Sequence, residues 1–135
     1  MNVINKLKEK GINVAEEWVA ECIKYLNNKP NFDLVYEQFL YTDLRLIGAG
    51  GITKKIADIH NQILDGSYVV QVNQLFNIGE AHEHRLTESS NRCLKLAMTD
   101  GKQTFFGFEY KRLSNTIHIH SKPGIKVCNF WIFFE

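Results

Sequence analysis

The chain has 135 residues, of which 44% are hydrophobic and 23% are charged, a balance typical of a soluble globular protein. Its formal net charge of +1 argues against a general nucleic-acid binder, because such proteins usually carry a clear basic excess. No window is long and apolar enough to span a membrane, and the N-terminus lacks the apolar core of a signal peptide. We therefore expect a protein of a reducing intracellular compartment, with free and mostly buried thiols at Cys22, Cys93 and Cys128.

The first part of the chain, residues 2–47, has the pattern of three short helices. Asn2 is placed to cap the first helix, which carries Ile4 and Leu7 and ends at Gly11. In the second helix, Asn13 and Glu16 resemble a capping box, and residues 27–30 (Asn-Asn-Lys-Pro) end it. Its apolar face consists of Ala15, Trp18, Val19, Cys22 and Leu26.

The third predicted helix begins at Asp33 as its cap and ends at Gly48, the position of a C-terminal cap. Its apolar stripe consists of Val35, Phe39, Leu40 and Ile47. Because three short helices with one apolar face each are marginal alone, we expect this bundle to pack on the rest of the chain. We expect Trp18 and Phe39 to be buried in it.

The run Gly-Ala-Gly-Gly at residues 48–51 is the best domain boundary, with a helical bundle at residues 1–50 and a β domain at residues 51–135. The segment after it carries Ile52, Ile56, Ile59 and Ile63. This spacing fits a helix, while the β-branched side chains and flanking glycines also permit an extended crossing.

Apolar residues recur at every second position from Tyr68, which predicts a long first strand with Val70 and Val72 on one face. Residues 79–91 are polar and without pattern, so we expect a loop. After a turn at Pro123 and Gly124, a further strand begins at residue 125, and the chain ends on an apolar run at residues 130–134.

A β-hairpin is predicted around Asp100 and Gly101, a pair that favours a two-residue turn with positive φ at both positions. On the first strand, Leu94, Leu96 and Met98 share one face. On the second, we assign Phe106, Phe108 and Tyr110 to the inner face and Phe105 to the outer face. Gly107 suggests a bulge or a coil, as small barrels need when they close.

Together these elements indicate an α+β protein, a small N-terminal three-helix bundle packed on a Greek-key barrel of the oligonucleotide/oligosaccharide-binding (OB) type. Four strong strands are visible where a closed barrel needs five, so we expect the barrel to be incomplete at the C-terminus.

Several stretches of the sequence resemble the N-terminal region of the RecQ-mediated genome instability protein 1 family and of its relative, the Tudor-domain-containing protein 3 family. They include Thr-Asp-Leu-Arg at residues 42–45 and Lys-Pro-Gly-Ile-Lys-Val at residues 122–127. The other matching stretches are residues 18–23, 35–48, 64–73, 94–101 and 108–110. The ordered series covers roughly residues 14–127, and it leaves open which of the two families is meant, because the helices look like the first and the short loop like the second.

The resemblance implies a non-enzymatic module, without metal or cofactor, that docks on topoisomerase III, a type IA topoisomerase. In the first family this serves genome maintenance in the nucleus, such as dissolution of recombination intermediates with a RecQ-type helicase. The Tudor-type relative acts with topoisomerase III on RNA or chromatin, which also permits the cytoplasm. The loop at residues 78–91 would insert at the topoisomerase gate, with Ile78, Glu80, His82, His84, Arg85 and Leu86 as partner contacts.

The sequence departs from this family pattern after residue 127, where the family continues through a glycine-containing strand and a last strand ending in Gly-Gly-Glu. Here Cys-Asn-Phe-Trp-Ile-Phe-Phe-Glu follows instead. We expect these few residues to be too short to finish one strand and supply another. An apolar segment at a sheet edge favours aggregation, so we expect the isolated chain to be unstable, to self-associate or to need a partner that covers its edge.

Other chemistry remains as alternatives. An OB domain that binds single-stranded nucleic acid alone would stack bases on aromatic side chains, with Phe105, Lys111 and Arg112 as possible contacts, although a core role for the aromatics is favoured. Two His-x-His pairs (residues 82–84 and 118–120) with Cys93 and Cys128 suggest zinc, yet no Cys-x-x-Cys spacing supports it. We interpret Asp43 as a helix-terminal contact, with a backbone amide or Arg45, because no catalytic base or metal partner is evident.

Overall fold

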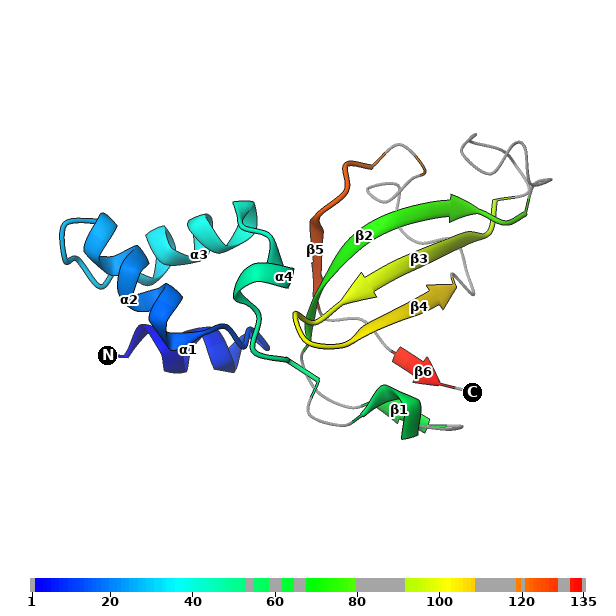
Figure 1. The fold of residues 1–135 in the computed structure, drawn as a ribbon, viewed down its shortest axis with the longest axis horizontal. Helices are drawn as coiled ribbons and strands as arrows, with labels where there is room; N and C mark the ends of the chain where they lie inside the picture. The colour runs from blue at the N-terminus through cyan, green and yellow to red at the C-terminus, as the bar shows by residue number, and fades with distance from the viewer. Residues whose placement is uncertain are drawn as a thin grey trace.

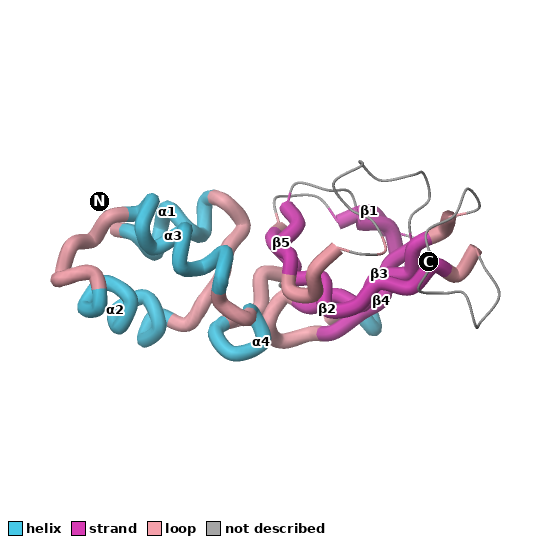
Figure 2. The backbone as a smooth tube through the Cα atoms, turned by 90° about the horizontal axis from the view of Figure 1, so that it is seen from above, coloured by secondary structure: helices cyan, strands magenta, loops and turns pink. Residues whose placement is uncertain are grey.

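The computed structural model describes residues 2–52, 55–58, 62–64, 68–79, 92–108, 119, 121–128 and 132–134. Its helices and its strands occupy opposite ends of the molecule, and the short helix α4 (Leu44–Ile47) lies where they meet (Figures 1 and 2). The structure therefore confirms an α+β fold, with helices followed by antiparallel strands.

Helix α1 (Val3–Glu9) begins and ends as the sequence predicts. The Asn2 side chain accepts a hydrogen bond from the Ile4 amide at 3.0 Å, which satisfies one of the free donors of the first turn. Gly11 follows the helix with φ of +81°, a left-handed conformation that ends helices at low cost in glycine. Leu7 lies buried on the inner face.

Helix α2 (Glu16–Tyr25) forms without the predicted capping box. Ala15 is the N-cap residue and makes no side-chain cap, while the Asn13 amide donates to the Gly50 carbonyl at 2.9 Å. Asn13 thus ties the start of this helix to the linker, and Glu16 and Glu17 supply the negative charge that favours a helix N-terminus. Asn27 and Asn28 end the helix, both with φ of +60°.

The predicted third helix is two helices. Helix α3 (Phe32–Tyr41) is capped by Asn31, whose side chain accepts from the Asp33 and Leu34 amides, so the prediction of Asp33 as the cap is wrong. Either residue type caps well, and Asn31 lies at the position from which its oxygen meets the free amides. The chain then turns at Thr42 and enters α4, to which Ile47 belongs.

The helices share a core to which one residue of the sheet, Val69, also belongs. Phe39 is buried in it as predicted, with 1% of its surface exposed. Trp18 packs against this core but is only partly buried, so the prediction that it is buried is confirmed only in part. The buried members are Val3, Leu7, Ile12, Val14, Val19, Cys22, Val35, Phe39, Leu44, Ile47 and Val69.

Four antiparallel strands form the main sheet, in the order β4-β3-β2-β5. They are β2 (Val69–Asn77), β3 (Leu94–Thr99), β4 (Thr104–Phe108) and β5 (Ile125–Cys128). The first of these in the chain, β2, is the predicted long strand, and it pairs with both β3 and β5. Among the described residues this sheet does not close, as expected for an incomplete barrel.

A second, two-stranded sheet joins β1 (Gln62–Leu64) to β6 (Ile132–Phe134), below the main sheet in Figure 1. The expectation that the C-terminal residues are too short for a further strand is therefore wrong, because three of them pair with β1. The ambiguous segment after the linker takes both of its possible forms in turn, a short 3-10 helix η1 (Ile56–Asp58) and then the extended strand. Self-association through an edge stays a prediction.

The core of the sheet lies on the face of β2 opposite the helices. Its register shifts between Val72 and Gln74, a bulge that turns Leu75 inward after Val70 and Val72. The bulge predicted at Gly107 is wrong, because β3 and β4 pair without a shift there. Gly107 instead leaves space for the end of the Met98 side chain. The buried members are Ile52, Val70, Val72, Leu75, Leu94, Leu96, Met98, Phe105 and Ile119.

The loop between β3 and β4 has four residues, because Thr99 pairs with Thr104, so the predicted two-residue turn is wrong. The Asp100 carboxylate organises this loop and accepts from the Lys102 and Gln103 amides at 2.9 and 2.7 Å. Its other oxygen accepts from the Ile52 amide at 3.0 Å. These bonds hold Asp100 buried, and in this loop only Gly101 has positive φ, at +102°.

The inner face of β4 is the opposite of the predicted one. Met98 pairs with Phe105 and Leu96 with Gly107, so odd-numbered residues of β4 face the core. Phe105 is buried, with 8% of its surface exposed, whereas Phe106 and Phe108 are 60% and 59% exposed. The reason is geometric. The β3–β4 loop has an even number of residues, so each even-numbered residue of β3 pairs with an odd-numbered residue of β4 and lies on the same face of the sheet.

Candidate functional site

Strand β2 holds the two halves of the molecule together. Its residues alternate between the sheet core and the helices, so Val70 and Val72 face one core while Val69 and Gln71 face the other side. At the same place, the backbones of Gly48 and Gly101 touch so closely that neither position has space for a Cβ atom. The helices thus dock on β2 and on the β3–β4 loop.

A buried glutamine forms the polar part of this junction. Gln71, 2% exposed, accepts a hydrogen bond from the Leu44 amide at 2.7 Å, a free donor at the start of α4. Its amide group donates to the carboxylate of Asp43 and to the side-chain oxygen of Asn73, both at 2.8 Å. The side chain of one β2 residue therefore fixes the position of α4.

Asp43 is the N-cap residue of α4. This confirms the interpretation of Asp43 as a helix-terminal contact with a backbone amide and Arg45. The Asp43 carboxylate accepts from the Arg45 amide at 2.9 Å and forms an ion pair with the Arg45 guanidinium, with 2.7 Å between the nearest atoms. The hydrogen bonds from the Arg45 side chain and then from Gln71 hold the pKa of Asp43 well below its usual range. An anion with this many donors is a poor proton acceptor, so the arrangement suits structure and not acid–base catalysis.

Strand β5 reaches the same junction through Lys126. Its ammonium donates to the Thr42 carbonyl at 2.7 Å and lies 5.4 Å from the centre of the Phe39 ring. Burial lowers the pKa of Lys126, and the Asp43 carboxylate opposes this shift. The side chains around this contact line a shallow surface pocket formed by Leu40, Tyr41, Thr42, Asp43, Arg45, Gln71, Asn73, Pro123, Gly124 and Lys126.

The junction should respond to acid in a defined way. Because the pKa of folded Asp43 lies below the unfolded value of about 3.9, the carboxylate contributes stability above that pH and loses it as the pH falls toward the folded value. We expect Asp43→Asn, which keeps a capping oxygen, to lower the free energy of unfolding by about 1 kcal/mol at pH 7.

The measurement is urea unfolding of the wild-type chain and the Asp43→Asn variant between pH 7 and pH 3. The difference between the unfolding free energies of the two chains should shrink below about pH 4, because Asp43 of the unfolded wild-type chain takes up a proton there. Asp33→Asn, in the first turn of α3, is the matched control. A difference that stays constant down to pH 3 would contradict the assigned role of the carboxylate.

A second feature is the base of the polar loop that follows β2. The buried side chain of Asn77 accepts from the Gly79 amide at 3.2 Å and from the Cys93 amide at 3.1 Å, so it bridges the two ends of the loop. The Ile78 amide also donates to the Cys93 carbonyl at 2.9 Å. The loop therefore leaves the sheet from a base closed by hydrogen bonds.

Of the predicted partner contacts, only Ile78 lies within the described residues, half-buried at this base. Glu80, His82, His84, Arg85 and Leu86 lie outside them, as do Lys111, Arg112 and the histidines of the zinc alternative. Phe105 lies in the sheet core, which contradicts its assignment to the outer face as a nucleic-acid contact.

Sequence reasoning missed Gln71 and Lys126 as junction residues. The available signal was a glutamine inside a strand otherwise rich in valine.

Among the described residues, no three His, Cys, Asp or Glu side chains gather as metal ligands. Burial raises the pKa of the Cys22 thiol, and neither Cys22 nor Cys93 forms a disulfide. No helix of the described ranges is long and apolar enough to cross a bilayer.

Both halves of the chain match known protein families. Residues 7–47 match the family described as RMI1, N-terminal helical domain. Residues 52–128 match the family described as RMI1, N-terminal OB-fold domain. The chain belongs to the RMI1 N-terminal family. In this chain the family fold consists of the helices and the four-stranded sheet that follows them, joined at the junction on β2.

Individual relatives agree with this assignment. The chain is 31% identical to RecQ-mediated genome instability protein 1 of Arabidopsis thaliana over 90% of its own length and 21% of that protein. For the protein of the same name from Oryza sativa subsp. japonica, the identity is 30% over 90% of the chain and 16% of that protein. Tudor domain-containing protein 3 of Danio rerio is 29% identical, again over 90% of the chain and 16% of its own length. The chain thus spans about a fifth of these relatives or less.

Proposed function

We propose that this chain is a non-catalytic scaffold that docks on a topoisomerase III and supports genome maintenance. The observation that carries the proposal is the match of both halves to the RMI1 N-terminal family, together with relatives named for RecQ-mediated genome instability. Within this proposal the chain works in the nucleus, in a complex with a RecQ-type helicase that dissolves recombination intermediates. Contact with nucleic acid is indirect or weak, consistent with the net charge of +1.

The junction supports a scaffold role. A docking module needs its two halves in a fixed relation, and here the Gln71 bonds and the contact of Gly48 with Gly101 provide it. The charged side chains at the junction have partners within the chain, since Arg45 forms an ion pair with Asp43 and Lys126 donates to the Thr42 carbonyl. The arrangement therefore favours rigid presentation of a surface over chemistry.

The loop after β2 is the proposed contact with the topoisomerase. The Asn77 side chain accepts hydrogen bonds from the Gly79 and Cys93 amides, so the two ends of this loop are held together beside the sheet. We expect replacement of residues 80–91 by a short Gly-Ser turn to leave folding intact and to weaken the complex by about tenfold or more, because the contacts of a whole segment are lost.

The measurement is calorimetric titration of a topoisomerase III with the wild-type chain and the loop variant, each checked by thermal unfolding. Tyr25→Ala, which removes an exposed ring from the helical end, is the control for a distant surface change. Unchanged affinity of the loop variant would remove the loop from the interface.

Two alternatives differ in their tests. A Tudor-type relative would also bind topoisomerase III, in an RNA or chromatin context, and the Tudor domain-containing protein 3 match keeps this open. An OB domain that acts alone would bind single strands tightly with a steep salt dependence and ignore the topoisomerase.

A further inference from the structure

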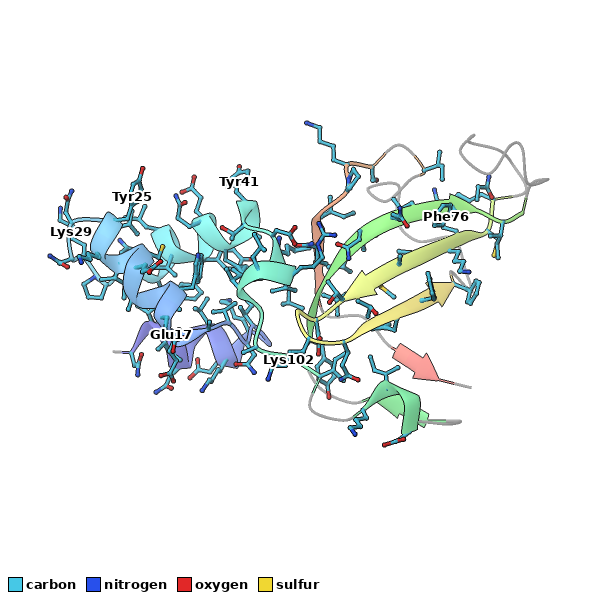
Figure 3. The ribbon with its side chains drawn as sticks, viewed as in Figure 1. Glu17, Tyr25, Lys29, Tyr41, Phe76 and Lys102 are labelled. Carbon is cyan, nitrogen blue, oxygen red and sulfur yellow. The ribbon has the colours of Figure 1, made fainter. Side chains whose placement is uncertain are left out.

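A basic surface pocket, here called the tip pocket, lies at the end of the helical half that points away from the sheet. It is lined by Lys6 of α1 and by residues 28–33, which lead from α2 into α3. Lys29 stands at this outer end of the molecule (Figure 3). The base of the loop after β2 lies at the opposite end (Figure 1). A ligand in the tip pocket therefore stays clear of that base.

Two ammonium groups converge on one aromatic ring of this pocket. The Nζ atoms of Lys6 and Lys10 lie 5.7 and 5.9 Å from the centre of the Phe32 ring. The two lysines are four residues apart at the C-terminal end of α1, where side chains with this spacing are neighbours and like charges repel. The negative face of the ring offsets only part of this repulsion. A bound anion would offset the rest.

The tip pocket carries more positive than negative charge. In the part of the chain that the structure describes, Lys6, Lys10 and Lys29 form no ion pair, and Asp33 is the one carboxylate of the lining. Asn31 also lines the pocket, and its side-chain oxygen accepts from two amides of α3, so only its NH2 group is left to meet a ligand. Ammonium and amide donors are the groups that bind a carboxylate.

We propose that the tip pocket, together with Lys10 beside it, binds a short acidic segment of a partner protein, one with clustered Asp or Glu side chains. Three ammonium groups gathered around one pocket match several carboxylates that follow one another closely in sequence. This goes beyond the proposed docking on a topoisomerase, because it gives the scaffold a second binding surface at its other end.

The tip pocket suits a protein segment better than nucleic acid. Single strands bind where bases stack on open aromatic rings, but the Phe32 ring is half-buried and stacks on Tyr36 with 5.7 Å between ring centres. The lysines gather at one pocket and do not form a track for a phosphate backbone. Nearer the middle of the helical half, Glu16 and Glu17 begin α2 with negative charge, which repels a longer polyanion (Figure 3).

The test is fluorescence anisotropy of a labelled peptide of about six glutamates, which spans about 20 Å when extended. The full 135-residue chain is titrated without a topoisomerase, so failure of this proposal and failure of the docking proposal are separate results. We expect the peptide to bind at about 50 mM salt and to bind about tenfold more weakly at about 500 mM, because salt screens exposed charges. A peptide of glutamines of the same length should not bind.

The deciding variant is the triple change Lys6→Gln, Lys10→Gln and Lys29→Gln. We expect it to weaken binding of the glutamate peptide by about tenfold or more, the combined effect of three exposed ion pairs. Replacing the same three lysines by arginine keeps the charge and should keep the affinity within about threefold. Lys29→Gln alone, at an exposed position outside the helices, should fold normally and weaken binding by about twofold to threefold.

A matched control removes the same charge elsewhere. Lys8→Gln, Lys55→Gln and Lys122→Gln change three exposed lysines that do not line the tip pocket. This variant should bind the glutamate peptide within about twofold of the wild-type chain, because distant exposed charges are screened.

Three results would overturn the proposal. One is equal affinity of the wild-type chain and the triple glutamine variant, with both folded by circular dichroism. Another is a wild-type chain that does not bind the glutamate peptide at about 500 µM and low salt, where even a weak specific complex forms. The third is an oligo(dT) of equal charge that binds more tightly than the peptide and loses affinity in the triple variant, which would make the pocket a nucleic-acid site.

Discussion

Replacing Phe39 by alanine is expected to lower the free energy of unfolding by about 3–5 kcal/mol, the usual cost of removing a fully buried ring. Phe39 is 1% exposed, stacks on Tyr36 with 6.3 Å between ring centres, and lies below the Lys126 ammonium of β5. Its loss leaves a cavity in the helical core and removes an apolar wall of the junction.

Urea unfolding followed by circular dichroism measures this change. Leu40→Ala is the matched control, because Leu40 is the next residue of α3 and is 41% exposed. We expect the control to cost about 1 kcal/mol or less. A Phe39→Ala variant as stable as the control would show that the helical core does not have the packing described above.

The second large effect is expected from Gln71→Leu. Leucine fills a similar volume, but the Leu44 amide is left buried without its acceptor and Asp43 loses a donor. We expect a loss of about 2–4 kcal/mol, since each buried polar group without a partner costs ~1–3 kcal/mol. Amide hydrogen exchange in α4 should accelerate more than exchange in β3, because the bonds lost are those that fix α4.

Gln74→Leu is the control for this change. Gln74 lies on the same strand, beyond the bulge, and its side chain is exposed. It should change stability by only about 0.5 kcal/mol. Equal effects of the two substitutions would mean that Gln71 does not link the halves.

The local parts of the fold could be predicted from the sequence. Asn2 and Gly11 bound α1 as predicted, because caps depend on neighbouring backbone groups. The prediction that Asp33 caps α3 failed for a local reason too. Asn31 also caps helices well, and it lies two residues earlier, where α3 begins. The family resemblance was confirmed by the matches over both halves of the chain.

The face of β4 shows where the sequence pattern misled. Three aromatics at every second position, from residue 106, suggested an inner face, but pairing across the β3–β4 loop decides the face. Loop length therefore carries more information than hydrophobicity in such a strand. The true register leaves Phe106 and Phe108 exposed on the outer face of β4.

The junction could not be predicted, because its contacts join residues far apart in the chain. Gln71 meets Leu44 and Lys126 meets Thr42, and neither pair leaves a periodic signal. The pairing of β1 with β6 is equally remote. The predicted loop contacts beyond Ile78 lie outside the described residues and remain predictions.

The measurement that tests the scaffold proposal most directly is the affinity of the 135-residue chain for a topoisomerase III, by calorimetric titration at physiological salt. The proposal predicts a one-to-one complex with a Kd of about 1 µM or tighter, within the range of specific protein interfaces. A correctly folded chain that gives no heat of binding at concentrations of about 100 µM, about a hundredfold above that Kd, would contradict it.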